Sequence, residues 1–373
     1  LVQGLLRKGA FDVAEGWEKW LLDLVGISTI ADMVPLTKEN RVLAHYGLKV
    51  LRKTPRVGLL KLLRRLRIDQ RYLSEDDVGF MIAPRINAAS RMADPRDAFE
   101  LLSTDDEALA DTKAAQLEKL NNERKGVVGA TVKEIRHTLE HRSEIAEVLV
   151  LGNPLWRPGL LGLTANTLME QYRRPVFLWG REGLPVGRVG GDLLKGSCRS
   201  DGTVNVLELM TVAAVFEEFG GHALSGGFSV AFDRVHTLEA ALVEAYKKVK
   251  QKEGQGVELV IDEVLPLSAV NQTTYGMLAK FAPFGIDNPK PVFLFENVRL
   301  ISVKQFGKEQ NHLELLLSDE GGKRVKAIGF FMNKEQFGPF AVEEGGSINL
   351  AASFENSTFG GRTELRLRIV DVL

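Results

Sequence analysis

The spacing of hydrophobic residues divides this chain into four stretches. In residues 1–102, an apolar run from Leu21 to Ile30 is predicted to form a strand. Leu and Val then recur every three or four residues over 38–51 and 56–68, which predicts two amphipathic helices. The first stretch is therefore predicted to belong to an α/β domain.

A single long helix is predicted for residues 103–145. Thr104 and Glu107 have the spacing of a capping box, and Leu, Val and Ile then recur at helical intervals as far as His141. If it is continuous, this helix measures about 55 Å at 1.5 Å per residue. A helix of this length with a narrow apolar stripe is typical of a connection between two domains, and a partner-binding coiled coil is the alternative.

The remaining two stretches differ in the period of their hydrophobic residues. In 146–252, apolar strand-like runs alternate with helical segments, which predicts a compact α/β unit. A polar linker, 251–256, precedes short β-type runs in 257–373, together with one helix at about 267–281. These runs are 257–264, 291–305, 311–318, 324–331, 347–354 and 363–372. They favour a small barrel of the OB-fold type, with a β-sandwich as the alternative.

Composition limits the class of protein. The chain has 373 residues, of which 45% are hydrophobic and 26% charged, so we expect an α/β multidomain protein with more than one core. The net charge of −1 means that any basic surface must be local, and eight basic residues between 52 and 71 form either such a surface or a solvated helix face. A single cysteine, with neither a signal peptide nor a membrane span in the sequence, predicts a cytoplasmic protein. The start at Leu1, inside an apolar run, predicts a fragment.

The segment 219–227 contains four glycines and one imidazole, that of His222. Glycine permits positive φ and lets a ligand approach backbone N–H groups closely, as at Gly220 and Gly221. A histidine in such a segment can donate to a phosphate or transfer a proton. The alternative is an ordinary helix-to-strand turn with a solvent-facing histidine.

A second candidate is Asp32, which follows the predicted strand that ends at Ile30. Open α/β sheets place ligands and metals at the carboxyl ends of their strands. A carboxylate there suits Mn²⁺ or Mg²⁺, which prefer oxygen donors. A turn or helix-capping aspartate is the more common explanation for an isolated residue of this kind.

Two polar segments suit phosphate binding. Arg85, Asn87 and Arg91 alternate with small residues, and arginine forks match phosphate oxygens. The segment 195–200 combines hydroxyls, a lysine and an arginine beside a glycine, as in a phosphate or sugar cradle. Solvated polar turns are the alternative. Cys198, within the second segment, is predicted to be a buried packing residue rather than a nucleophile.

Together and in this order, these motifs resemble the RecJ family of single-stranded-DNA-specific exonucleases, in the DHH phosphoesterase superfamily. The matching segments are 23–36, 39–41, 84–89, 156–159, 196–200, 220–222 and 283–293. The resemblance implies the C-terminal part of a DHH catalytic domain in 1–102 and a connecting helix in 103–145. It also implies a DHH-associated substrate-binding domain in 146–252 and an OB-fold in 257–373.

The resemblance further implies 5′-to-3′ hydrolysis of single-stranded DNA in repair and recombination, with two Mn²⁺ or Mg²⁺ ions. Asp32 then corresponds to a metal-binding aspartate, and Asp32 and His222 to catalytic residues. The implied substrate-binding residues are Arg85, Asn87, Arg91, Ser197, Arg199, Gly220, Gly221 and His222. Single-stranded DNA is the expected partner of a monomer, together with a single-strand-binding protein or a helicase.

This chain departs from the family pattern in places. The Asp-His-His motif would precede Leu1, so the chain alone is expected to be inactive. Arg157 stands where the family often has histidine. A phosphodiesterase of oligonucleotides or cyclic dinucleotides, or a non-catalytic DNA-binding scaffold, are the alternative functions. In the barrel, the phenylalanines that could stack on bases or belong to the core are Phe281, Phe284, Phe306 and Phe337.

Overall fold

The computed structural model describes residues 2–9, 14–181, 193–249, 258–307, 310–338, 342–357 and 363–373. The predicted linker 251–256 lies outside these ranges. The chain divides into two compact units, and we describe each by itself. The first, called the barrel unit, comprises Leu1–Thr54, Asp69–Phe80 and Glu258–Leu373. The second, called the α/β unit, comprises Pro55–Ile68 and Met81–Val257.

The barrel unit begins with helices α1 (Val2–Arg7), α2 (Leu22–Ala31) and α3 (Lys38–Leu51). The strand predicted for Leu21 to Ile30 is therefore wrong, because this run forms α2. A short, continuously apolar run has no period that separates a buried strand from a buried helix. The helix predicted over 38–51 is confirmed as α3.

Two glycines bring α2 and α3 together. A Cβ atom on Gly26 would lie 2.8 Å from the Cα atom of Gly47, so only glycine permits this backbone approach. Asp23 is buried beside the crossing and accepts a hydrogen bond of 2.6 Å from the Thr54 hydroxyl. The apolar sequence of α2 thus serves tight helix packing rather than a sheet.

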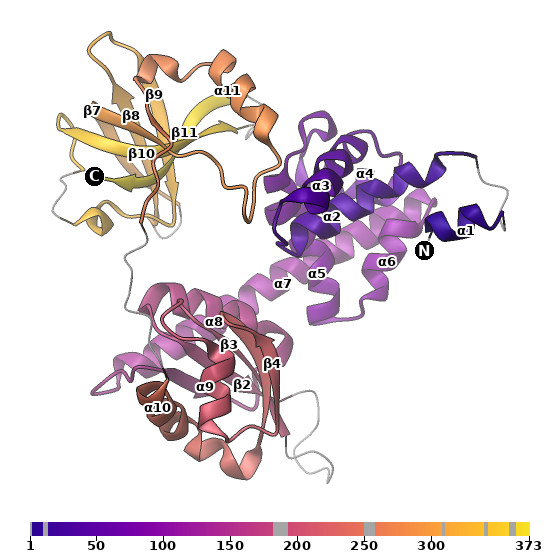
Figure 1. The fold of residues 1–373 in the computed structure, drawn as a ribbon, viewed down its shortest axis with the longest axis vertical. Helices are drawn as coiled ribbons and strands as arrows, with labels where there is room; N and C mark the ends of the chain where they lie inside the picture. Colours follow the sequence, from indigo (N-terminus) through magenta and orange to yellow (C-terminus); the bar gives the residue numbers. More distant parts are fainter. Residues whose placement is uncertain are drawn as a thin grey trace. The chain divides into compact units, whose positions relative to one another are not determined.

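The C-terminal part of the barrel unit confirms the predicted OB-type barrel (Figure 1). After β6 (Glu263–Val264) and α11 (Gln272–Leu278), five long strands follow. They are β7 (Phe293–Phe306), β8 (His312–Ser318), β9 (Arg324–Phe330), β10 (Ser347–Ser357) and β11 (Glu364–Val372). Pairing in the order β10-β11-β9-β8-β7 and then from β7 back to β10 closes the barrel. Alternate residues such as Leu313, Leu315 and Leu317 fill its interior.

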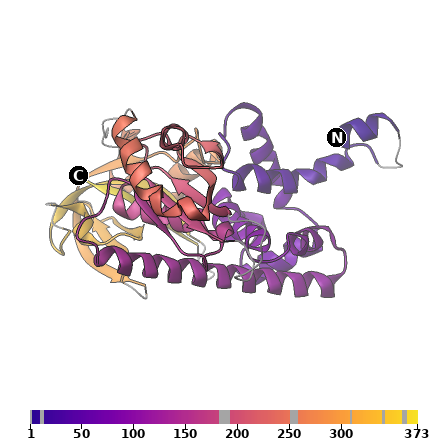
Figure 2. The same ribbon diagram turned by 90° about the horizontal axis from the view of Figure 1, so that it is seen from below.

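The α/β unit opens with α4 (Val57–Leu66), α5 (Ala83–Met92), α6 (Arg96–Ser103) and α7 (Glu107–Glu140). The long helix is confirmed: α7 has 34 residues and is drawn nearly along its length in Figure 2. At 1.5 Å per residue it measures about 50 Å. Its N-cap is Asp106, whose carboxylate accepts from the N–H groups of Ala108 and Leu109. No helix in the described ranges is both long and apolar enough to cross a membrane.

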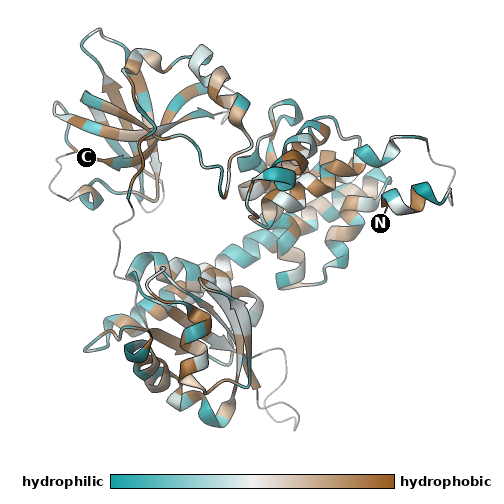
Figure 3. Ribbon diagram, viewed as in Figure 1, coloured by the Kyte–Doolittle hydropathy of each residue, from teal (hydrophilic) through white to brown (hydrophobic). Residues whose placement is uncertain are grey.

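A five-stranded sheet of order β1-β2-β3-β5-β4 forms the rest of this unit. Its strands are β1 (Leu149–Gly152), β2 (Val176–Gly180), β3 (Leu193–Arg199), β4 (Glu218–His222) and β5 (Ser225–Ala231). The helices are α8 (Pro158–Tyr172), α9 (Val206–Ala213) and α10 (Leu238–Lys248). Apolar residues of α7 and α8 pack on one face of the sheet, and those of α9 and α10 on the other. Figure 3 colours the inner strands mainly brown, as expected for a strand buried on both faces.

Short helical segments complete the described fold. The 3-10 helices are Trp17–Leu21, Gln70–Tyr72, Phe232–Thr237, Leu267–Ala269, Ala279–Phe281 and Lys334–Phe337. A π-helical turn occupies Asp77–Ile82, directly before α5. The polar turn offered as an alternative for 85–91 is wrong, because these residues lie in α5. The helix-to-strand turn predicted at Gly220–His222 is also wrong, because they lie in β4 and the chain reverses at Ala223 and Leu224.

Candidate functional site

Three of the predicted site residues meet on one face of the sheet. Arg199 on β3 lies directly opposite Ser225 on β5, and Ser225 lies opposite His222 on β4. Residues opposite each other in an antiparallel pair project to the same face. Ser197, two residues before Arg199, shares that face because side chains alternate along a strand. Strand pairing thus brings His222 to the same face as Ser197 and Arg199, which precede it by more than twenty residues.

The face that carries them is the one covered by α7 and α8. Val176 and Leu178, opposite Arg199 and Ser197 on β2, belong to the core formed with these two helices. Cys198 points the other way, into the core with α9 and α10. Burial raises the pKa of the Cys198 thiol to about 12, which confirms it as an inert packing residue.

Glycines leave the far end of this sheet open. Every residue of the edge strand β4 is exposed, including Gly220, Gly221 and His222. Gly221 has φ of 143°, and a Cβ atom there would lie 2.3 Å from the Ser225 carbonyl oxygen. A Cβ on Gly220 would meet nothing within 4 Å. Gly221 is therefore required by the backbone, whereas Gly220 leaves an uncovered surface that a ligand can approach.

Arg199 is held close to the sheet without a charged partner. Its Nη1 donates to the Cys198 carbonyl oxygen at 2.7 Å. A Cβ on Gly162 of α8 would lie 2.8 Å from its Nη2, so a glycine makes room for the guanidinium. Burial, and then repulsion from Arg91, lower the pKa of Arg199. In the described part of the chain, no carboxylate pairs with it.

The predicted residues of α5 divide between two faces of the helix. Arg85 is buried, and its Nε donates to Glu118 Oε2 on α7 at 2.7 Å. Asn87 lies about 200° around the helix from Arg85 and is exposed. Asn87 and Arg91, four residues apart, share a face. The structure thus ties Arg85 to a carboxylate and presents Asn87 and Arg91 to the surface.

Arg91 joins α5 to the start of α8. Its Nη1 donates to the Gly159 carbonyl oxygen at 2.9 Å, and its side chain is exposed. Arg157, which precedes α8, is exposed and lies 3.9 Å from the Met92 sulfur atom. The first turn of α8 is therefore bordered by two guanidinium groups, one of them close enough to Arg199 to repel it.

One group of residues was missed by our reading of the sequence. Asn121 and Arg124 lie on the inward side of α7, between apolar turns of the helix. Arg124 is within electrostatic reach of both Arg91 and Arg85, which add to the effect of burial in lowering its pKa. The available signal was the gap in the apolar stripe between Leu120 and Val127, because polar residues at inward positions are unusual.

Asp32, the predicted metal ligand, lies in the barrel unit. It is an exposed C-cap of α2, not the residue after a strand, so the argument from strand ends is wrong. Among the described residues, no three His, Cys, Asp or Glu side chains are grouped to hold a metal ion. Asp32 alone does not make a divalent-metal site.

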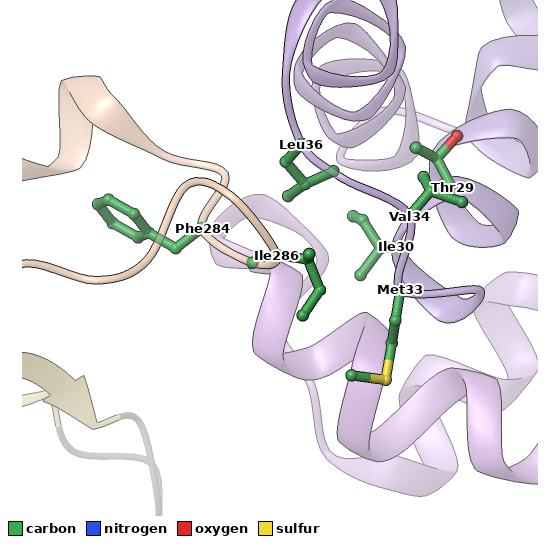
Figure 4. Close-up of a pocket in the computed structure, with 8 residues that line it drawn as sticks. Thr29, Ile30, Met33, Val34, Leu36, Phe284 and Ile286 are labelled. Carbon is green, nitrogen blue, oxygen red and sulfur yellow. The ribbon is translucent and has the colours of Figure 1, made fainter. Parts of the chain in front are cut away.

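An apolar pocket of about 130 Å³ is lined by residues on both sides of Asp32 in the sequence, from Thr29 to Leu36 (Figure 4). Ile30, Met33 and Leu36 face the loop that carries Phe284 and Ile286. The Leu36 N–H donates to the Ile286 carbonyl oxygen at 2.7 Å, so the loop and the end of α2 are joined through the backbone. The segment after α2 therefore packs against the loop that carries Phe284 and Ile286.

The barrel carries aromatic rings of its own. Phe306, His312, Phe330 and Phe331 form a connected group in which neighbouring ring centroids lie 4.9–6.4 Å apart. Phe331 is 75% exposed and was not singled out from the sequence. Of the phenylalanines named there, Phe281 is 59% exposed and Phe337 is buried.

Comparison with known proteins gives a consistent family. Residues 261–371 match the model described as the RecJ OB domain. The chain is 30% identical to the single-stranded-DNA-specific exonuclease RecJ of Bacillus subtilis, over 94% of this chain and 44% of that protein. Identity to the RecJ of Thermus thermophilus is 32%, over 73% of this chain and 38% of that protein. These alignments cover less than half the length of either relative.

Solved structures agree with the sequence comparison. The crystal structure of Thermus thermophilus RecJ in complex with Mg²⁺ superposes with a TM-score of 0.76 at 26% identity. The match covers 99% of this chain and 53% of that one. The corresponding complex with Mn²⁺ gives a TM-score of 0.77 at the same identity. The described part of the chain thus has the fold of the matching half of RecJ.

Proposed function

Because the chain is a homologue of the RecJ exonucleases over 94% of its length, we propose that it holds the substrate strand of a single-stranded-DNA-specific exonuclease. The observation that supports this most strongly is the row of Arg199, Ser225 and His222 beside an open, glycine-lined sheet edge. A polyanion can approach such a surface closely, and the unpaired guanidinium supplies the attraction.

Each residue has a role that follows from its chemistry. Arg199 and Arg91 would bind phosphate oxygens through their guanidinium N–H groups. The Ser197 hydroxyl and the open backbone near Gly220 would contribute neutral donors. The exposed His222 imidazole would donate to a phosphate oxygen or to the leaving oxygen. Asn87, on the same face of α5 as Arg91, would contact the strand next to it.

The second part of the proposal concerns the hydrolysis reaction. We infer a metal-dependent exodeoxyribonuclease that acts in the 5′-to-3′ direction in DNA repair and recombination, with Asp32 as one ligand of a divalent ion. Relatives named RecJ have been solved with Mg²⁺ and Mn²⁺. A bound divalent ion would polarise the phosphodiester and activate water. A monomeric state and binding to a single-strand-binding protein or a helicase stay predictions.

Fluorescence anisotropy with 5′-phosphorylated single-stranded and duplex DNA, across a salt series, tests the proposal. We expect a preference for the single strand, and a loss of about 30-fold in affinity for Arg199→Ala, or about 2 kcal/mol. Arg234→Ala is the matched control, because Arg234 is an exposed arginine of the same unit. Equal binding of both DNA forms, with Arg199→Ala unaffected, would favour a small-nucleotide phosphodiesterase or a scaffold.

A further inference from the structure

The inward face of α7 changes character in its middle. Ala110, Ala114 and Leu117 are buried on one side of the gap, and Val132, Ile135 and Leu139 on the other. Between them, the helical spacing brings Asn121 and then Arg124 to the same face. An amphipathic helix that only had to pack would continue its apolar stripe through this turn.

Asn121 is enclosed without a hydrogen-bond partner. Its side chain is 0% exposed, and neither Oδ1 nor Nδ2 has a partner within the described ranges. Arg124 Nε is likewise buried and unpaired. Buried polar atoms are nearly always hydrogen-bonded, because removing them from water without a partner destabilises the fold. An apolar residue at position 121 would fold at least as well, so folding alone does not account for this asparagine.

The arginines around this part of α7 also indicate a binding site for an anion. Arg91 donates to the Gly159 carbonyl oxygen and the Arg199 guanidinium lies against Gly162, so both groups border the first turn of α8. Arg124 is in turn repelled by Arg91 and Arg85. Arg85 is compensated by Glu118. For Arg91, Arg124 and Arg199, the described residues provide no carboxylate partner. Cations that a fold holds together at this cost are completed by an anion.

We propose that Arg124, with the unpartnered amide of Asn121 one helical turn before it, joins Arg91 and Arg199 in binding a backbone phosphate of single-stranded DNA. The connecting helix α7 is then a wall of the substrate groove and not only a link between domains. This inference rests on the proposed function, because the anion it names belongs to the proposed substrate. The planar guanidinium of Arg124 supplies the paired N–H donors that a phosphate accepts.

The decisive variant is Arg124→Ala, measured by anisotropy with single-stranded DNA across a salt series. We expect affinity to fall about tenfold, and the slope of log K against log salt to lose about 0.7, as for one lost phosphate contact on a single strand. Arg124→Lys keeps the charge but not the fork, so its affinity should be intermediate while its slope is unchanged. The matched control is Lys133→Ala, an exposed cation farther along α7, which should bind like the wild type.

Asn121→Leu separates a binding role from a packing role. We expect its melting temperature to rise, because the unpaired amide is removed, while DNA affinity falls. Oligonucleotides with a 5′-phosphate or a 5′-hydroxyl then separate an internal phosphate from a terminal one. Equal losses for both confirm the internal backbone phosphate named here, and a loss confined to the 5′-phosphorylated strand contradicts it.

Two failures are distinguishable. If Arg199→Ala weakens binding while Arg124→Ala retains wild-type affinity and slope, the role of α7 is wrong and the proposed function stands. If the wild-type chain shows no preference for single-stranded DNA and Arg199→Ala changes nothing, the proposed function fails and this inference fails with it. A folding defect in Asn121→Leu leaves the two Arg124 variants to decide.

Discussion

The two units of this protein differ in the pairing of arginines on their sheets and on the helices beside them. In the barrel, Arg366 and Arg368 both pair with Glu355, at 2.5 and 3.5 Å, and Lys326 pairs with Glu364 at 2.8 Å. In the α/β unit, Arg91, Arg124 and Arg199 have no carboxylate partner among the described residues. Charge pairs in the barrel thus connect neighbouring strands, whereas these three arginines of the α/β unit, unlike Arg85 with its partner Glu118, keep their guanidinium groups free of a carboxylate.

The surfaces differ in the same sense. The barrel is closed, and it exposes an aromatic group that includes Phe331. The α/β sheet ends in the fully exposed edge strand β4, which contains Gly220 and Gly221. Aromatic rings bind nucleobases by stacking, which salt hardly affects, while guanidinium groups bind phosphates in a salt-dependent way. We therefore expect the two units to make different kinds of contact with the same strand, and the following variants test that division.

The largest effect is expected at the open edge. Gly221→Ala should lower the free energy of unfolding by about 3 kcal/mol, because φ of 143° and the Ser225 carbonyl leave no room for a Cβ atom. Urea denaturation measures this change. Gly220→Ala is the matched control, since a Cβ there meets nothing within 4 Å.

Gly220→Ala also tests the open surface itself. It should leave stability unchanged and still weaken binding of single-stranded DNA, because the added methyl group covers the backbone. Equal stability of the two alanine variants would show that the edge does not depend on the Gly221 conformation. Unchanged DNA affinity in Gly220→Ala would show that the strand does not lie against it.

Arg366→Ala should reverse the pattern expected for Arg199→Ala. Without Arg366, the largely buried Glu355 carboxylate keeps only Arg368 as a partner. The free energy of unfolding should therefore fall by about 2 kcal/mol. Affinity for single-stranded DNA should stay within about twofold, because the Arg366 charge is already neutralised. Denaturation and anisotropy on the same preparation measure both quantities. A tenfold loss of affinity with unchanged stability would erase the contrast between the units.

A smaller effect is expected from Phe331→Ala. If one base stacks on this ring, affinity should fall about fivefold, or about 1 kcal/mol, while the salt slope stays at the wild-type value. Phe80→Ala is the control, because Phe80 is equally exposed, at 75%, and has no ring partner among the described aromatic residues. A change in slope would mean that Phe331 acts on phosphate contacts, contrary to the proposed division.

How much the sequence predicted depended on whether the local pattern had a unique period. Short apolar runs such as 311–318, separated by turn clusters such as Gly321-Gly322, favoured strands, and the barrel was predicted correctly. The run ending at Ile30 has no such period, and the close packing of α2 on α3 at Gly26 and Gly47 joins residues 21 apart. Local pattern cannot report that contact.

The candidate site shows the same limit. Arg199 and His222 were predicted as separate motifs, and their shared row depends on the pairing of β3 and β4 with β5. Arg124 was missed because a charged residue in a long helix is usually solvated. Only the buried surroundings of Asn121, supplied by residues far along the chain, distinguish Arg124 from the other basic residues of α7.

The smallest effect concerns Glu75, a buried carboxylate of the barrel unit. Glu75 is 9% exposed, and burial raises its pKa, although its own N–H and the Phe284 N–H, which donates at 3.1 Å, oppose the rise. Since the folded-state pKa is raised, stability should fall as pH rises from the ordinary glutamate value of about 4.3 through the folded-state value.

Glu75→Gln keeps an acceptor for the Phe284 N–H and removes the titration. We expect its free energy of unfolding to exceed that of the wild type slightly at pH 7 and the difference to vanish toward pH 4, as measured by urea denaturation at each pH. Glu320→Gln, an exposed carboxylate in the turn after β8, should run parallel to the wild type. A variant less stable than the wild type at pH 7 would mean that the Glu75 carboxylate is satisfied in its charged form. The buried charges at Glu75 and at Glu355 with Arg366 in the barrel would then both be compensated by neighbouring groups, unlike Arg124 and Arg199 of the α/β unit.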